Sequence, residues 1–229
     1  MNPIVQISMD VTTTAEALEI GEVAVQAGVD WLEAGTPLIL GEGLHAVTAL
    51  KERFTNNPVV ADLKIMDGGY LETEMAAKAG ADFVVVMARA PVATIRACVK
   101  AGREFGCQVM GDVLLGDGAC HEDPVVHAKM LAAEGVDAIV LHTSYDARHE
   151  SPMDPLEYVA DVVAAVNIPV QVVGGLSIDN MVECVHLGAP LVVVGAPLVV
   201  DDERFAAADE LGQLNLVIQE VVNRVKRSG

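Results

Sequence analysis

Short apolar runs alternate with stretches of helical periodicity along the whole chain. Runs such as FVVVM and LVVVG lack polar alternation, which is typical of parallel strands that are covered on both faces. Between the runs, apolar residues recur at spacings of three and four, which indicates helices. The pattern predicts a last helix over residues 204–226 and eight strands, at residues 4–9, 31–34, 59–63, 83–87, 108–112, 138–141, 170–173 and 191–194.

A glycine-centred motif recurs four times, each time between a predicted helix and a predicted strand. It reads Gly-x-Asp from Gly28, Gly80 and Gly135 and Gly-Ala-Pro from Gly188, at spacings of 52, 55 and 53 residues. Glycine adopts the positive φ that ends many helices. A fourfold βαβα repeat of this length predicts an α/β fold, a single (β/α)8 TIM barrel over residues 1–229. A doubly wound open sheet is the alternative, but its usual G-x-G-x-x-G fingerprint is absent from the sequence.

Charge and composition narrow the classes of partner. The 229 residues carry 14 basic and 33 acidic side chains, a formal charge of −19, and such a surface repels nucleic acid and anionic membranes. The apolar runs are shorter than a membrane helix needs and the N-terminus has no basic leader, so we expect a cytoplasmic protein. The four cysteines show no C-x-x-C spacing, which favours free thiols over a zinc site.

Polar residues gather where the predicted strands end. Chemistry in barrels of this type lies at the carboxyl ends of the strands, and the residues found there are Asp10, Glu33, Asp62, Lys64, Asp67, Asp112 and His142. Structural roles stay open for several of them: a helix cap for Asp10, a buried ion pair for Glu33 and a hydrogen-bonded core side chain for His142. Asp112 fits either kind of role.

Glu33 and Asp62 fall on neighbouring predicted strands, and we expect both to point toward one barrel mouth. Two carboxylates, completed by water and substrate oxygens, suit Mg²⁺, which keeps several non-protein ligands; Mn²⁺ is the alternative. Lys64, beside a metal and two acids, stays protonated and can stabilise an anionic intermediate or deliver a proton. A purely structural salt-bridge cluster of Asp62, Lys64 and Asp67 is the competing interpretation.

Glycine-rich turns follow the last two predicted strands. Gly174 and Gly175 precede a predicted helix in VVGGLS, and Gly195 and Ala196 follow the eighth strand in VVVGAP. Backbone N–H groups in such turns are not obstructed by side chains, and the loops after strands seven and eight are the usual phosphate site of these barrels. We therefore expect these four residues to bind a phosphate group.

Four stretches of the chain resemble one known family. LEAGTPLI around Glu33, VADLKIMDGGYLETEMAAKAGAD around Asp62, LHTSYD around His142 and the paired glycines are similar to the 3-hexulose-6-phosphate synthases. Those enzymes, together with the 3-keto-L-gulonate-6-phosphate decarboxylases, belong to the orotidine 5′-monophosphate decarboxylase superfamily. The D-x-K-x-x-D signature at residues 62–67 marks the superfamily, and GTPLI at residues 35–39 favours the synthase branch. The resemblance covers nearly the whole chain.

The resemblance implies a reaction and a set of roles. The reaction is a Mg²⁺-dependent aldol condensation of formaldehyde with D-ribulose 5-phosphate, through an enediolate, to D-arabino-hex-3-ulose 6-phosphate. The partners are then a phosphorylated ketose and a small aldehyde. The resemblance implies that Glu33 and Asp62 hold the metal, that Lys64 places positive charge beside the intermediate, that His142 is the acid/base and that Asp10 binds substrate.

The resemblance also implies a homodimer with shared active sites. In this superfamily the residue that matches Asp67 orients the one that matches Lys64 and reaches the site of the neighbouring subunit. We therefore expect Asp67 to act across a subunit interface.

Several positions depart from the family pattern. The decarboxylases usually carry an arginine three residues after the histidine, where this chain has Tyr145, and this favours the synthase. After the eighth strand the family has Gly-Gly or Gly-Arg, where this chain has Gly195-Ala196. Arg89 follows the fourth strand, where small residues are usual, and either points into the site or lies on the surface. The segment 114–127 is enlarged, which is consistent with a different aldehyde or sugar phosphate.

The alternatives are a decarboxylase of 3-keto-L-gulonate 6-phosphate, a lyase that acts on another phosphorylated ketose, and a non-catalytic sugar-phosphate-binding barrel. The last of these has no need for a metal, a lysine and a histidine in one set, so the sequence favours an enzyme.

Overall fold

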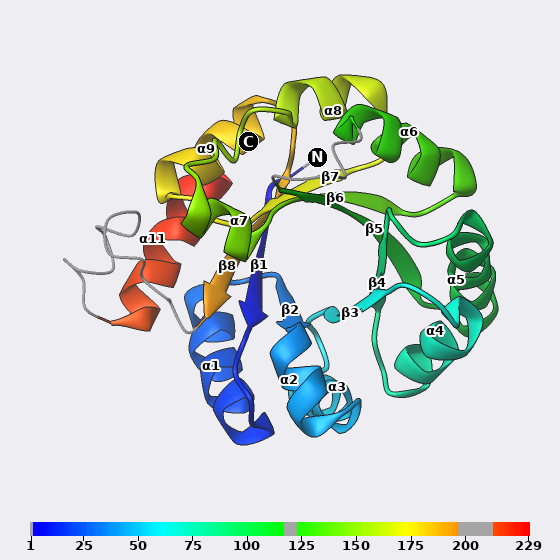
Figure 1. Ribbon diagram of the computed structural model, residues 1–229. Helices are drawn as coiled ribbons and strands as arrows, with labels where there is room; N and C mark the ends of the chain where they lie inside the picture. The colour runs from blue at the N-terminus through cyan, green and yellow to red at the C-terminus, as the bar shows by residue number, and fades with distance from the viewer. Residues whose placement is uncertain (1, 117–122, 197–212) are drawn as a thin grey trace.

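The computed structural model describes residues 2–116, 123–196 and 213–229, which form a closed barrel of eight parallel strands surrounded by helices (Figure 1). Each strand pairs with its neighbour in sequence, and β8 closes the barrel against β1. The strands are β1 (Ile4–Met9), β2 (Trp31–Ala34), β3 (Val59–Ile65), β4 (Phe83–Met87), β5 (Gln108–Leu115), β6 (Ala138–Thr143), β7 (Val170–Val173) and β8 (Leu191–Ala196). The predicted (β/α)8 barrel is confirmed, and the alternative of an open doubly wound sheet is wrong.

The helices connect the strands on the outside of the barrel (Figure 1). Those within the described residues are α1 (Thr14–Ala27), α2 (Thr36–Glu42), α3 (His45–Arg53), α4 (Gly69–Lys78), α5 (Val92–Phe105), α6 (Pro124–Glu134), α7 (Tyr145–Glu150), α8 (Val159–Ala165), α9 (Ile178–His186) and α11 (Leu214–Arg227). The predicted last helix is present as α11, which packs against α1 and α9; its predicted residues 204–212 lie outside the described residues. In the described part of the chain, no helix combines the length and the apolar character that crossing a membrane requires.

The recurring glycine motif connects helices to strands in two ways. All four glycines adopt positive φ, between 90° and 100°, at the point where a helix ends. In the first three repeats, the aspartate two residues later accepts a hydrogen bond from a backbone N–H of the preceding strand. These bonds join Val5 to Asp30 (2.9 Å), Val59 to Asp82 (2.7 Å) and Val109 to Asp137 (2.7 Å). The motif therefore fastens β1 to β2, β3 to β4 and β5 to β6 at their amino ends.

Apolar side chains fill the barrel near the starts of its strands. Val60, Val85, Met110 and Val140 belong to this inner cluster, and the ring of Trp31 stacks on that of Phe83 with centroids 4.3 Å apart. A larger apolar layer lies between the barrel and the helices and includes the buried free thiols Cys98 and Cys184. Because apolar residues occupy the amino-terminal end of the barrel, the charged side chains of its interior lie toward the carboxyl end.

Candidate active site

A cavity of about 490 Å³ opens at the carboxyl ends of the strands. Its described lining includes nine of the residues singled out by the sequence, namely Asp10, Glu33, Asp62, Lys64, Asp112, His142, Gly174, Gly175 and Gly195. The volume falls in the range of small-molecule sites. The barrel thus brings most of the candidate residues to one place, as residues at the ends of parallel strands should be.

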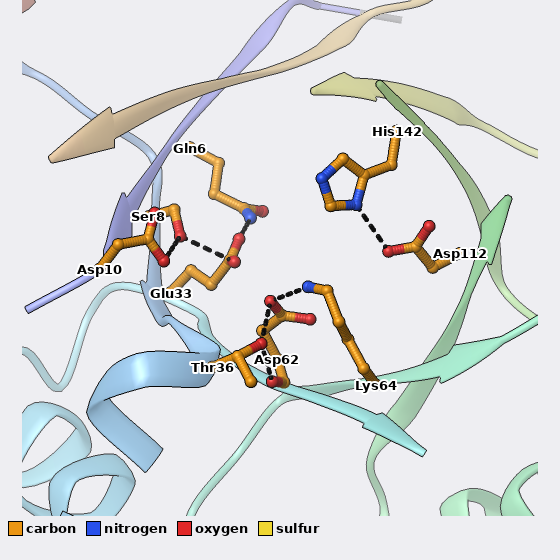
Figure 2. Close-up of polar contacts among 9 residues, drawn as sticks. All are labelled: Gln6, Ser8, Asp10, Glu33, Thr36, Asp62, Lys64, Asp112 and His142. Atoms are coloured by element: carbon orange, nitrogen blue, oxygen red, sulfur yellow. Dashed lines mark hydrogen bonds and ion pairs between the residues drawn. The ribbon is translucent and has the colours of Figure 1, made fainter. Parts of the chain in front are cut away.

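Glu33 lies inside the barrel on β2 and is 8% exposed. Both of its carboxylate oxygens accept hydrogen bonds, one from Gln6 Nε2 and the other from Ser8 Oγ at 2.9 Å (Figure 2). Gln171 Nε2 in turn donates to Gln6 Oε1 at 2.9 Å. This chain of buried amides fixes the Glu33 carboxylate and closes the floor of the cavity.

Glu33 also shares its surroundings with other acids. Burial, followed by the charges of Asp62 and Asp10, raises the pKa of Glu33 to about 8. Asp10 stands at the rim, exposed to the cavity yet flanked by protein, and burial and then Asp62 raise its pKa as well. Two acids with raised pKa values beside a third carboxylate make a place where a cation is favourable.

A metal ion would find its ligands among these acids. No group of three or more His, Cys, Asp or Glu side chains within the described residues is arranged to hold one. A magnesium site of the expected kind needs only Glu33 and Asp62 from the protein, because water and substrate oxygens complete its coordination. The oxygen-only donor set and the raised pKa of Glu33 fit Mg²⁺.

An irregularity in β3 places Lys64. Between Ala61 and Ile65 the register advances by four residues on β3 against two on β4. Lys64 has φ +48° and is the one non-glycine residue with positive φ in the described ranges. Its Nζ forms an ion pair with Asp62 Oδ2, and Thr36 Oγ1 donates to the same oxygen at 2.8 Å (Figure 2). Strained backbone of this type is typical of functional sites.

The charge on Lys64 is held by its acidic neighbours. Burial acts to lower the pKa of Lys64, but the charges of Asp62, Asp112 and Glu33 and a hydrogen bond to Asp62 outweigh it and raise the pKa. The side chain is therefore a permanent cation in the cavity at neutral pH.

His142 and Asp112 form a pair on the opposite wall. His142 Nδ1 lies 2.9 Å from Asp112 Oδ2 (Figure 2), and Asp112 is 1% exposed with no hydrogen-bond partner for its other oxygen. The carboxylate favours the tautomer that carries its proton on Nδ1. In this tautomer the other ring nitrogen, Nε2, carries the lone pair. Figure 2 shows that Nε2 points away from Asp112, toward the interior of the barrel. This arrangement makes His142 suited to accept a proton from a ligand.

The glycine turns bound the cavity on the side of β7 and β8. Gly174 has φ +98°, and a Cβ there would lie 2.2 Å from the carbonyl oxygen of Thr143, so no other residue fits. Gly175 also has positive φ. A Cβ on Gly195 would meet only Asp10 Oδ2, at 3.9 Å, so the cavity is open at this point. Ala196 is fully buried in the outer apolar layer and does not line the cavity.

Asp67 and Arg89, like Ala196, are predicted site residues that do not line this cavity. Asp67 is exposed beyond the end of β3, where its Oδ1 accepts from the backbone N–H of Gly68 at 2.8 Å. Arg89 is exposed and lines a second cavity, of about 1020 Å³, next to the end of β5, α6 and α8. His127 is 7% exposed and lines this second cavity too. Residues 117–122 of the enlarged segment lie outside the described residues.

Other polar residues of the cavity do not stand out in the sequence. They are Gln6, Ser8, Thr36, Gln171 and Arg148, of which all but Gln6 are in the cavity lining. The run IVQISMD could have revealed Gln6 and Ser8, because polar side chains at alternate positions of a strand share a face with Asp10. Arg148 lies on α7, several residues after the end of β6, so the strand pattern does not predict that it lines the cavity.

The barrel and the polar cluster at its mouth define a (β/α)8-barrel enzyme. The chain belongs to the orotidine 5′-phosphate decarboxylase / HUMPS family, whose model matches residues 3–211.

Two relatives and one solved structure that cover nearly the whole chain are named 3-hexulose-6-phosphate synthase. The chain is 36% identical over 207 residues to 3-hexulose-6-phosphate synthase of Staphylococcus haemolyticus, a match that covers 90% of this chain and 95% of the relative. It is 32% identical over 209 residues to the enzyme of that name from Bacillus subtilis, covering 91% and 97%. The crystal structure of 3-hexulose-6-phosphate synthase from Salmonella typhimurium matches with a TM-score of 0.81 at 30% identity, over 98% of this chain and 100% of that one.

Proposed function

We propose that the protein catalyses the Mg²⁺-dependent aldol condensation of formaldehyde with D-ribulose 5-phosphate to D-arabino-hex-3-ulose 6-phosphate. The proposal rests on one observation: two carboxylates, a lysine and a histidine line the same cavity. These residues are Glu33, Asp62, Lys64 and His142. The choice of substrates is supported by the name shared by the relatives at 32% to 36% identity. The proposed reactants are small enough for a cavity of about 490 Å³.

Glu33 and Asp62 are the residues that would hold the metal. Their carboxylate oxygens suit Mg²⁺. The raised pKa of Glu33 reflects the unfavourable free energy of its buried charge, which a bound cation would offset. When bound, Mg²⁺ supplies positive charge that polarises substrate oxygens.

The proton transfers fall to His142. In the proposed reaction its Nε2 takes a proton from C1 of the ketose, which leaves an enediolate, and Asp112 holds the ring and stabilises the imidazolium that forms. The enediolate carbon then bonds to the carbonyl carbon of formaldehyde. His142 returns the proton to the new alkoxide, so that protons balance over the cycle. Lys64 keeps a positive charge beside the negative charge that develops.

The glycine turns and Asp10 are proposed to hold the substrate. Gly174, Gly175 and Gly195 line the cavity, and their backbone N–H groups are proposed to bind the phosphate group. Asp10 lies beside Gly195, since a Cβ on Gly195 would be 3.9 Å from Asp10 Oδ2, and it is proposed to accept a hydrogen bond from a substrate hydroxyl.

A homodimer is part of the proposal, because Asp67 does not line the cavity of its own chain. Large apolar side chains are exposed close to it in sequence, with Met66 and Met75 50% exposed and Leu71 60% exposed. An exposed apolar group of this kind is typical of a protein contact surface. A second copy seated there would bring Asp67 to a neighbouring site.

The proposal is tested by following formaldehyde consumption with ribulose 5-phosphate and Mg²⁺, with and without EDTA. We expect consumption that EDTA abolishes and that Lys64→Ala lowers by at least about 10³-fold. The same preparations are offered 3-keto-L-gulonate 6-phosphate, with release of CO₂ as the readout. If wild type consumes no formaldehyde, or consumes it no faster than Lys64→Ala, the proposed reaction is wrong; CO₂ release would establish the decarboxylase in its place.

A further inference from the structure

Two permanent cations line the cavity within the described residues, Lys64 and Arg148. Lys64 is committed to the acid cluster by its ion pair with Asp62. Arg148 comes from a different wall, since it lies on α7, which follows β6 after the single residue Ser144. The two cations therefore serve different parts of the cavity.

The position of Arg148 is tied to the first glycine turn. α7 begins directly after Thr143, and it is the carbonyl oxygen of Thr143 that a Cβ at Gly174 would touch. The strand before α7 is also hydrogen-bonded to the strand before the turn, with His142 opposite Val173. Arg148, Gly174 and Gly175 all line the same cavity. Arg148 thus lines the cavity from the helix that follows β6, and the glycine turn lines it from the end of the neighbouring strand β7.

The local structure holds the guanidinium in a defined orientation. Its carbon lies 5.1 Å from the centroid of the Tyr145 ring, within the range of a cation–π contact. The Tyr145 ring packs in turn against His149, with centroids 4.3 Å apart. Ser144 caps the helix by accepting from the backbone N–H of Ala147 at 3.3 Å. A guanidinium is planar and presents its N–H groups in one plane, the geometry that binds two phosphate oxygens at once, and the contact with Tyr145 restricts its movement.

The negative charge of the cavity makes a cation necessary wherever an anionic ligand binds. Four carboxylates, those of Asp10, Glu33, Asp62 and Asp112, face the two cations in the described lining. An anionic ligand is repelled by this excess unless a cation lies at its own end. Neither of the residues expected to surround the phosphate after β8 carries a charge, and Arg89 lines the other cavity.

We propose that Arg148 binds the phosphate group of the substrate, together with backbone N–H groups of Gly174 and Gly175, and thereby selects phosphorylated over unphosphorylated ketoses. The inference rests on the proposed function for the identity of the ligand. The anion site itself is a property of the cavity and can be measured without turnover.

The first experiment is calorimetric titration of inorganic phosphate into wild type, Arg148→Gln and Arg96→Gln. Arg96 is a matched control, because it is an exposed arginine whose partner, Glu134, lies outside the cavity. We expect Arg148→Gln to weaken phosphate binding about 10- to 100-fold, the loss that follows removal of charge-assisted hydrogen bonds, and Arg96→Gln to leave it unchanged. Phosphate affinity within twofold of wild type in a folded Arg148→Gln protein would overturn the inference.

A second variant covers the case in which Arg148→Gln does not fold. Arg148→Lys keeps the charge and loses the planar fork, and we expect it to weaken phosphate binding by about 3- to 10-fold. Equal affinity in Arg148→Lys and wild type would count against a two-point contact and overturn the proposal in that form.

Turnover separates this inference from the proposed function. We expect Arg148→Gln to raise KM for ribulose 5-phosphate by the same factor as the phosphate Kd, with kcat and KM for formaldehyde within about threefold of wild type. Wild type and Arg148→Gln should both use unphosphorylated ribulose poorly and at equal rates. If Arg148→Gln lost as much activity with ribulose as with ribulose 5-phosphate, the selective role of Arg148 would be overturned. If wild type is inactive while Arg148→Gln still loses phosphate binding, the proposed function fails and the anion site stands.

Discussion

Replacing Glu33 by glutamine should make the metal-free protein more stable at high pH. The buried carboxyl of Glu33 has its pKa raised to about 8 by burial and by Asp62 and Asp10. Glutamine keeps the shape of the side chain, and its amide can accept from Gln6 and donate to Ser8, the two groups that now contact the carboxylate. The substitution therefore removes a costly charge while it preserves the hydrogen bonds.

The size and sign of the effect follow from the two protonation equilibria. In the unfolded chain the Glu33 carboxyl ionises at its ordinary pKa of 4.5, and in the folded protein at about 8. Between these values the folded state binds more protons, so its stability falls as pH rises and then stays low above pH 8. Each pKa unit corresponds to about 1.4 kcal/mol, which sets the full penalty at on the order of 5 kcal/mol. Below pH 4.5 the penalty vanishes.

The assay is urea unfolding in EDTA at pH 4.5, 6.5 and 8.5. We expect wild type and Glu33→Gln to have similar free energies of unfolding at pH 4.5, and Glu33→Gln to be more stable by several kcal/mol at pH 8.5. Glu220→Gln, a substitution of an exposed glutamate on α11, should follow wild type at every pH. Saturating Mg²⁺ should stabilise wild type at pH 8.5 and should not stabilise Glu33→Gln. A constant difference across the pH range, or a less stable Glu33→Gln protein at pH 8.5, would refute the reasoning.

Three further predictions concern the site. Asp112→Asn should lower kcat by about 10²- to 10⁴-fold, with KM little changed, because an amide no longer fixes the tautomer of His142; kcat within threefold of wild type would contradict the pair's role. Gly174→Ala should cost at least about 2 kcal/mol of stability in urea unfolding, because φ is +98° and a carbonyl oxygen lies 2.2 Å from the new Cβ; an unchanged midpoint would show that the turn adapts. Lys64→Ala and Asp67→Asn should each be inactive. When the two variants are mixed under conditions that exchange subunits, the mixture should regain up to about a quarter of wild-type activity, because a dimer that shares its sites then has one intact site in each mixed pair. A mixture that stays inactive despite subunit exchange would assign both residues to the site of the same chain.

The barrel could be predicted from the sequence because its two signals are local. Apolar runs without alternation indicate strands covered on both faces, and the glycines that end helices mark the start of every second strand. The strand ends were less visible: β3 and β6 continue to Ile65 and Thr143, beyond the predicted ends at residues 63 and 141. Those extensions contain Lys64 and His142, polar residues that face a cavity, and a pattern based on burial treats such residues as loop.

The site was predictable as far as position at a strand end determines it. Glu33 and Asp62 sit on strands that the sequence predicts, so their direction follows from the period of two. Arg89 lies in a turn, where the direction of a side chain depends on backbone angles that no periodicity reveals, and the structure turns it toward the second cavity. Arg148 reaches the first cavity only because α7 folds back over the barrel mouth, a tertiary arrangement that its neighbours in sequence do not encode.

At three strand pairs an aspartate accepts a hydrogen bond from a backbone N–H of the preceding strand, and at the fourth pair no aspartate is present to do so. Pro190 stands where the repeat would have an aspartate, and β7 and β8 share only two paired residues in the described sheet, Gln171 with Leu191 and Val172 with Val192. The pairing of β7 with β8 is therefore the weakest in the described sheet, and Gly174 and Gly195 lie at the ends of these two strands. We expect amide protons along this pairing to exchange with solvent before those of the other strands. A barrel that is rigid around Glu33, Asp62 and Asp112 and loose around Gly174 can admit and release a ligand on one side without disturbing the charges on the other.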